Sequence, residues 1–254
     1  MLVIMPVKDS LDTARESIAA LTQALSAHHS SLITHRSSLI VYNDFSTPEN
    51  TAELERMSSE MGFELVNWAD RTNHPSPNYR LTLQDAQQRA LEHDEHLVIV
   101  ESDVVVRPDT LQRLESVVNV SGDQLNTKHL TLNTKIGMVA AVTVDTNGNI
   151  NFPYLYAQKL KGDIVDTHKR FSFCCTLLSN EFLKAFSFIQ LDPEKSWYDV
   201  FISHQSVALG FHNLLMLNNA VLHKPHSSRP WKKLKYTNPI KYYWQKITRK
   251  RDRI

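Results

Sequence analysis

The first hundred residues alternate short apolar runs with longer segments whose apolar residues recur at helical spacing. The apolar runs have the length of buried strands and cover residues 2–7, 38–44, 63–68 and 96–102. The helical segments between them cover residues 10–28, 46–62 and 79–93. This alternation predicts βαβ units, so we expect an α/β fold with a Rossmann-like, mainly parallel central sheet flanked by helices.

The second half of the chain has a different pattern. Strands are predicted at 135–145 and 169–179, and helices at 180–188 and 198–210, with a turn at Asn147-Gly148. We therefore expect this half to add mixed strands to the sheet. No shift in composition marks a domain boundary, so residues 1–225 are predicted to form a single domain.

Composition excludes several classes of protein. The net charge of +1 argues against a general nucleic-acid binder, and no apolar stretch approaches the roughly 20 residues that span a bilayer. No basic residues precede the short apolar run at the N-terminus, so we expect no signal peptide. Cys174 and Cys175 are adjacent, which disfavours a mutual disulfide, and we interpret them as reduced core thiols of a cytoplasmic protein.

The C-terminal tail, residues 226–254, departs from this balance because it is strongly basic and carries interspersed Trp and Tyr. Two interpretations remain open. The tail associates peripherally with the anionic inner face of the cytoplasmic membrane, or it forms a solvated helix whose aromatic side chains pack on the body.

Polar groups end three of the predicted parallel strands. Lys8-Asp9 follows the first, Asn43-Asp44 the second and Glu101-Ser102-Asp103 the fourth. An unpaired charge at the end of a buried strand is costly, whereas the carboxyl edge of an open parallel sheet is where ligands bind. These side chains therefore predict a binding site at that edge.

Glu101 and Asp103 are two residues apart. In an extended segment they point to the same side, while Ser102 is turned away. Two carboxylates suit Mg²⁺ or Mn²⁺, which keeps positions open for water and phosphate oxygens. The alternative is that these acids only end a strand and cap the helix that Pro108 is predicted to begin.

Five motifs in order resemble the family-2 inverting glycosyltransferases, which have the GT-A fold. They lie mainly within residues 2–223 and run "VIMPVKDSLDTARESIAAL", "VYNDFSTPENTAEL", "LVIVESDVVVRPDTL", "WYDVFISHQSVALGF" and "NNAVLHKPHSS". The resemblance implies a nucleotide-binding half (1–105) and an acceptor-side half (106–225). It also implies transfer of a sugar, with inversion, from a nucleoside diphosphate sugar to a glycan or lipid-linked acceptor, as in bacterial cell-surface polysaccharide assembly.

The resemblance and the chemistry of the side chains together give a candidate site. Asp103 and His223 are expected to hold Mn²⁺ or Mg²⁺, and Asp199 to act as the general base that takes the acceptor proton. Trp197 is the candidate for stacking on the acceptor. The expected nucleotide contacts are Pro6, Val7, Lys8, Asp44, Arg80, Glu101 and Ser102.

Simpler roles remain open for several of these residues. Asp199 could be an N-cap, a role that is compatible with catalysis. His223 could be a surface residue or one whose hydrogen bonds are already satisfied, and Trp197 could close the core. The sequence also departs from the family, with Glu101, Asn43, Lys8-Asp9, Tyr198, Phe201 and Gln205 at motif positions. These departures leave the nucleotide and the acceptor undefined.

Two other functions compete with this prediction. A sugar-phosphate nucleotidyltransferase has a related fold but needs a Gly-rich loop, and "MPVKDSLD" contains no Gly. A non-catalytic sugar-nucleotide binding module is compatible with the altered motif around Asp199.

Overall fold

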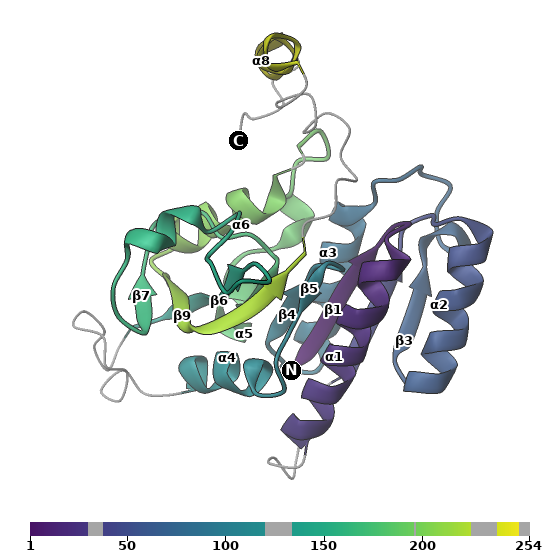
Figure 1. Cartoon of the computed structure of the whole chain (residues 1–254), viewed down its shortest axis with the longest axis horizontal. Coiled ribbons are helices and arrows are strands. Elements are labelled where there is room, and N and C mark those ends of the chain that lie inside the picture. The colour runs from purple at the N-terminus through teal and green to yellow at the C-terminus, as the bar shows by residue number, and fades with distance from the viewer. Residues whose placement is uncertain (30–37, 120–133, 196, 225–237, 249–254) are drawn as a thin grey trace.

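The computed structural model describes residues 1–29, 38–119, 134–195, 197–224 and 238–248 of the 254-residue chain. Within these ranges, a central nine-stranded sheet has the order β3-β2-β1-β4-β8-β6-β9-β5, and β7 pairs with β9 (Figure 1). The bounds of the strands are β1 (Leu2–Val7), β2 (Ser38–Asn43), β3 (Glu64–Asn67), β4 (Leu97–Val100), β5 (Val104–Val105), β6 (Ile136–Val144), β7 (Ile164–Asp166), β8 (Cys175–Leu178) and β9 (His212–His223).

The helices are α1 (Leu11–His29), α2 (Pro48–Met61), α3 (Tyr79–Glu92), α4 (Thr110–Asn119), α5 (Asn180–Ala185), α6 (Tyr198–Ala208) and α8 (Pro239–Thr248). Within the described residues, the short 3₁₀ helices are η1 (Trp68–Asp70), η3 (Leu155–Lys159) and η4 (Phe188–Gln190). The predicted βαβ alternation is confirmed, because β1 pairs in parallel with β2 and β4, and β2 pairs in parallel with β3. The mixed second half is confirmed as well, since β8 runs antiparallel to both β4 and β6.

Local sequence signals explain several element ends. The Thr47 side chain accepts a hydrogen bond from the backbone N–H of Asn50 and caps α2, which ends at Gly62 with φ of 74°. Glycine adopts this left-handed conformation without steric cost. The expectation that Pro108 begins a helix is wrong. Thr110 begins α4, and its hydroxyl accepts a hydrogen bond from the backbone N–H of Arg107.

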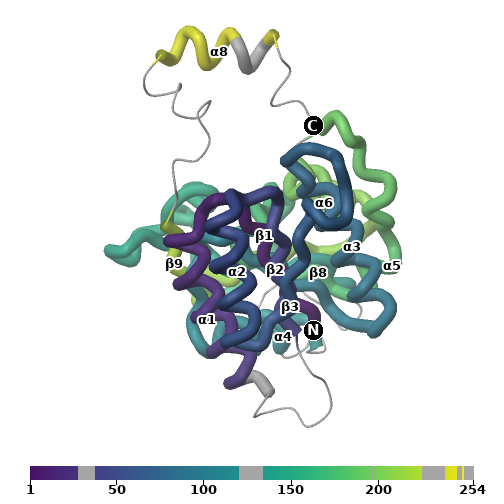
Figure 2. The backbone as a smooth tube through the Cα atoms, turned by 90° about the vertical axis from the view of Figure 1, so that its right-hand side faces the viewer, coloured from purple at the N-terminus to yellow at the C-terminus, as the bar shows by residue number. Residues whose placement is uncertain are grey.

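The two faces of the sheet carry separate cores. Along β1, Val3 and Met5 pack with α1, α2 and α4, whereas Leu2 and Ile4 pack on the opposite face with α3 and α5. Figure 2 shows α1 and α2 on one side of the strands and α3 on the other. Because both faces are covered, binding groups collect at the edge where the strands end.

Candidate functional site

Hydrogen bonds join the carboxyl ends of the parallel strands into one edge. Beyond β1, the ammonium group of Lys8 donates to the backbone carbonyls of Asp44 and Phe45, each 3.2 Å away. The Ser10 and Ser102 hydroxyls lie 2.9 Å apart and link the start of α1 to the end of β4. Pro6 and Val7 lie in β1, beside β2. The structure therefore brings the first predicted group of nucleotide contacts together.

Asp44 anchors a loop as well as lying on this edge. Its carboxylate accepts hydrogen bonds from the Ser76 hydroxyl at 2.7 Å and from the backbone and side-chain N–H groups of Asn78 at 3.0 and 2.8 Å. Asn78 is buried and directly precedes α3. This anchoring role was not evident from the sequence, since the two residues are 34 positions apart.

The acidic segment after β4 is a turn, not the extended segment that we expected. Its strand ends at Val100, and the backbone N–H of Val104 donates to the carbonyl of Glu101 at 3.1 Å. Ser102 is turned away from the two acids, as expected, and contacts Ser10, whereas Glu101 and Asp103 both lie close to His223. The expected orientation is therefore present, but a tight turn produces it.

His223 ends β9 and faces Asp103. Its Nδ1 lies 2.7 Å from the carbonyl oxygen of Phe152, which can only accept, so Nδ1 carries the proton in that contact. Its Nε2 lies 3.6 Å from Oδ2 of Asp103. Burial acts to lower the pKa of His223, but the hydrogen bond and negative charge of Asp103, with a smaller contribution from Glu101, raise it overall. His223 is thus buried, so it is not a surface residue, and its contacts with Phe152 and Asp103 leave the alternative of a hydrogen-bonded, satisfied histidine open.

Cys174 joins the same cluster. Its thiol lies 3.3 Å from Oε2 of Glu101, and the backbone N–H of Glu101 donates to the Cys174 carbonyl at 3.0 Å. One ligand atom each from Glu101, Cys174 and His223 lie within 4.8 Å of one another. Burial first, and then the Glu101 carboxylate, raise the pKa of the Cys174 thiol. Cys175 is a buried core thiol, as expected, whereas Cys174 is buried and also contacts the Glu101 carboxylate.

The donor atoms fit a divalent cation. Carboxylate oxygens of Glu101 and Asp103, with a ring nitrogen of His223, form the kind of set that Mn²⁺ accepts. The charge of two adjacent acids in a largely buried setting also favours a cation beside them. A protonated thiol contributes little to a hard ion, so Cys174 is a neighbour of this set rather than a member of it.

The remaining candidates lie at the starts of α3 and α6. Tyr79 and Tyr198 place their ring centroids 6.5 Å apart, which brings the two helix starts together. Burial raises the pKa of Tyr198, and the nearby positive charge of Arg80 opposes this effect. Trp197 is the N-cap residue of α6 and Asp199 lies in its first turn, so the simple capping role for Asp199 is wrong.

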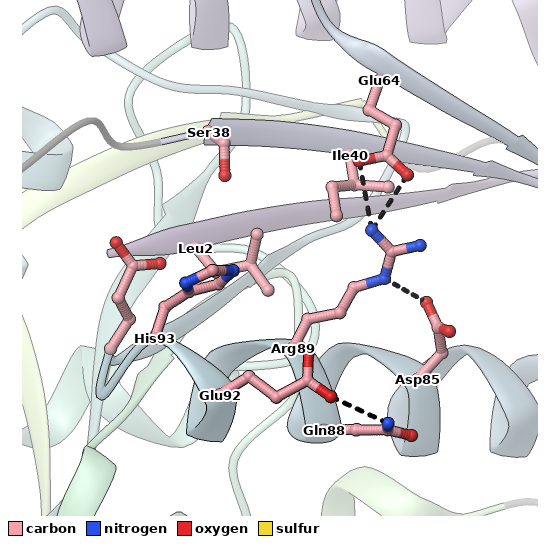
Figure 3. A pocket seen from close by; sticks show the side chains of 10 residues that line it. Leu2, Ser38, Ile40, Glu64, Asp85, Gln88, Arg89, Glu92 and His93 are labelled. Carbon is pink, nitrogen blue, oxygen red and sulfur yellow. Dashed lines mark hydrogen bonds and ion pairs between the residues drawn. The ribbon is translucent and has the colours of Figure 1, made fainter.

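A polar pocket of about 360 Å³ lies at the opposite end of the strands (Figure 3). Leu2 and Ser38, the first residues of β1 and β2, line it together with residues of α3. Within it, Arg89 bridges Glu64 and Asp85. This pocket shares no residue with the cluster around His223. The candidate site is therefore the cluster at the carboxyl edge, where the side chains that can bind a cation lie.

Comparison of the structure with solved structures identifies the fold. S. aureus TarS 1-349 in complex with UDP superposes with a TM-score of 0.59 and 13% identity over 92% of this chain and 63% of that one. The mannosyltransferase PcManGT from Pyrobaculum calidifontis, solved with GDP-Man and Mn²⁺, gives 0.58 and 12% identity over 97% and 64%. This chain has a GT-A glycosyltransferase fold.

A third solved structure is similar to this chain over most of its length. Mycobacterium tuberculosis glucosyl-3-phosphoglycerate synthase, bound to Mn²⁺, UDP and glucosyl-3-phosphoglycerate, gives a TM-score of 0.51 and 14% identity over 92% of this chain and 74% of that one. No family model matches the sequence. No curated protein matches it. The chain spans less than two thirds of the TarS and PcManGT chains, and these identities establish the fold alone.

Proposed function

We propose that this GT-A chain is an inverting glycosyltransferase that moves a sugar from a nucleoside diphosphate sugar to an acceptor hydroxyl. The observation that supports this proposal is the Asp103–His223 pair, with Glu101 beside it, at the carboxyl edge of the parallel strands. The similar structures of PcManGT and glucosyl-3-phosphoglycerate synthase were solved with Mn²⁺ and a nucleotide or nucleotide sugar.

On the donor side, positive charge would stabilise the bound nucleotide and the leaving diphosphate. Asp103 and His223 would hold Mn²⁺ or Mg²⁺, with Glu101 directed to the ribose or the ion. Such an ion, when bound, supplies Lewis-acid stabilisation of the charge that develops on the leaving diphosphate. Lys8 and Arg80 would add positive charge on the nucleotide side, and Pro6, Val7, Asp44 and Ser102 would shape the pocket for the base and ribose.

The acceptor side would remove a proton. In a single displacement with inversion, a carboxylate on the face opposite the leaving group takes the proton of the attacking hydroxyl. We assign this role to Asp199, because the N-terminus of α6 favours its ionised form. Trp197, partly buried next to it, would stack on the acceptor sugar.

The acceptor and its location form the finer part of the proposal. We propose a glycan or lipid-linked glycan acceptor, as in bacterial cell-surface polysaccharide assembly at the cytoplasmic side of the membrane. Residues 226–254 carry ten Lys and Arg and one Asp, whereas residues 1–225 carry an acidic excess of eight. This separation of charge favours attachment of the tail to an anionic surface.

Only part of that tail is within the described residues, namely α8; residues 225–237 and 249–254 are outside them. On α8, Ile240, Tyr243 and Trp244 follow the spacing of one helix face and are 84%, 51% and 69% exposed. An exposed apolar face flanked by Lys suits an interfacial helix. Among the described helices, none has the length and apolar character needed to cross a bilayer.

A donor screen tests the proposed function. Purified protein is incubated with UDP- and GDP-sugars, with and without Mn²⁺, and thermal stability and release of nucleoside diphosphate are measured. The proposal predicts Mn²⁺-dependent stabilisation and release with at least one donor. Stabilisation by nucleotides without any turnover over a panel of glycan and lipid-linked acceptors would instead support a binding module. No response to any nucleotide would overturn the proposal.

A further inference from the structure

The cluster around His223 contains a thiol that the proposed reaction does not use. Glu101 follows β4, Cys174 precedes β8, and His223 ends β9, so three separate parts of the chain bring an oxygen, a sulfur and a nitrogen together. We propose that these three side chains form a second ligand set, which binds a thiophilic divalent cation such as Zn²⁺.

The distances allow all three atoms to contact one ion. They lie within 4.8 Å of one another, and the Sγ–Oε2 distance is 3.3 Å. Zn²⁺ binds sulfur at about 2.3 Å and nitrogen or oxygen at about 2.0–2.2 Å, so two ligands of one ion lie at most about 4.5 Å apart, which is close to the 4.8 Å within which these three atoms already lie. Three protein ligands leave a fourth tetrahedral position for water.

The surroundings hold the three ligands in place. The Phe152 carbonyl accepts from Nδ1 of His223, which leaves Nε2 as the nitrogen that can bind an ion. The hydrogen bond from the backbone of Glu101 to that of Cys174 continues the pairing of β4 with β8. The second feature is part of the sheet, and the first orients the imidazole ring at the end of β9.

The thiol determines which ion this set prefers. Thiolate sulfur selects soft or borderline ions, whereas Mn²⁺ and Mg²⁺ prefer oxygen. When Zn²⁺ binds, it forms a bond to sulfur in place of the S–H bond, and the proton leaves to solvent. His223 belongs both to this set and to the Asp103 set, so one ion excludes the other. Zinc would therefore inhibit Mn²⁺-dependent turnover, and only this last step rests on the proposed function.

Cobalt spectroscopy tests the ligand set without any nucleotide. The metal-free full-length protein is titrated with Co²⁺ alone, which takes the place of Zn²⁺ and gives a sulfur-to-cobalt charge-transfer band in the near ultraviolet. The band should appear with the wild type and disappear with Cys174→Ser. The matched control is Cys175→Ser, which changes a neighbouring buried thiol outside the cluster and should keep the band.

Zinc competition gives the second measurement. Zn²⁺ should displace bound Co²⁺ at one ion per chain, and Cys174→Ser should weaken zinc binding by more than the roughly 10- to 100-fold that loss of an outer partner costs. Circular dichroism confirms that each variant is folded. Absence of the band in the wild type, or its persistence in folded Cys174→Ser, would overturn the proposal.

Asp103→Asn separates this inference from the proposed function. The variant should keep the cobalt–sulfur band, because Asp103 is outside the thiol set, while it loses Mn²⁺-dependent nucleotide binding. A wild-type protein with the band but no response to any nucleotide would retain the zinc site and contradict the transferase. Manganese-dependent transfer without the cobalt–sulfur band would support the transferase and contradict the zinc site.

Discussion

The Oδ2 atom of Asp103 lies 3.6 Å from Nε2 of His223, although 120 residues separate them in the chain. Their side chains are only 7% and 4% exposed. A buried carboxylate is costly unless a positive or hydrogen-bonding group lies beside it, and the imidazole partly meets that need. The divalent cation of the proposed function would meet it more fully and would account for two acids directly after a buried strand.

Asp199→Asn tests the proposed general base. The change removes the proton acceptor but keeps the size of the side chain, so kcat should fall by about 10²- to 10⁴-fold. The KM for the donor should change little, because Asp199 is assigned to the acceptor side. Steady-state kinetics measure both values. Asp192→Asn, which alters an exposed carboxylate before α6, is the matched control; equal kinetics for the two variants would rule out the assignment.

Asn78→Ala tests the anchoring of the loop before α3. Asn78 supplies two of the three hydrogen bonds to the Asp44 carboxylate, one through the side chain that the substitution removes. We expect the free energy of unfolding to fall by about 1.5–3 kcal/mol, as for loss of a hydrogen bond to a charged group. Denaturant titration measures this change. Asn73→Ala, in an exposed part of the same loop, should have no comparable effect; a similar loss there would argue against the anchor.

His96→Gln tests a half-buried histidine far from the site. Burial lowers the pKa of His96 below its ordinary value of 6.5, and its Nδ1 accepts a hydrogen bond from the backbone N–H of Asn180 at 2.9 Å. The unfolded chain therefore binds the proton more readily. The contribution of neutral His96 to the free energy of unfolding is fully present above pH 6.5, and it is lost as the pH falls through the pKa of His96 in the folded protein.

The expected result is that His96→Gln loses less stability than the wild type between about pH 7.5 and pH 5. Urea unfolding across this range measures the difference. His93→Gln removes an exposed histidine three residues earlier and should keep the wild-type slope. If the free energy of unfolding changed with pH equally in His96→Gln and the wild type, the lowered pKa of His96 would not contribute to the pH dependence of stability.

Vesicle sedimentation tests the tail. The full-length chain should bind anionic vesicles, bind neutral ones weakly, and dissociate as salt is added. Replacement of Ile240 and Trp244 by Ser should reduce binding, because it removes the exposed apolar face of α8. Leu209→Ser, which removes an exposed apolar side chain of the body, is the control. Equal binding by all variants, or none by the wild type, would exclude membrane attachment by this helix.

Local patterns were sufficient to predict much of the first half. β1 matches its predicted range, β2 differs by one residue at one end, and β3 differs by one residue at each end. Each is a short apolar run between turn or cap residues. The predicted helix at 46–62 also agrees closely with α2, since its N-cap Thr47 and its end at Gly62 depend on neighbours a few residues apart.

Contacts between distant segments could not be predicted in this way. Cys174 reaches Glu101 only because β8 inserts antiparallel beside β4, and strand order is not a property of local sequence. The turn at 101–103 was missed for a related reason. The hydrophobic run predicts where β4 begins, but its end depends on β8 and on the bond from Val104 to Glu101.

The most direct test of the central claim is Mn²⁺-dependent nucleotide binding by the wild type and by Asp103→Ala. Isothermal titration with UDP and GDP, with and without Mn²⁺, is compared with Asp109→Ala, which removes an exposed carboxylate six residues away. The account predicts that Mn²⁺ strengthens binding in the wild type and in Asp109→Ala, and that this effect disappears in folded Asp103→Ala. Retention of the full effect of Mn²⁺ without Asp103 would contradict the account.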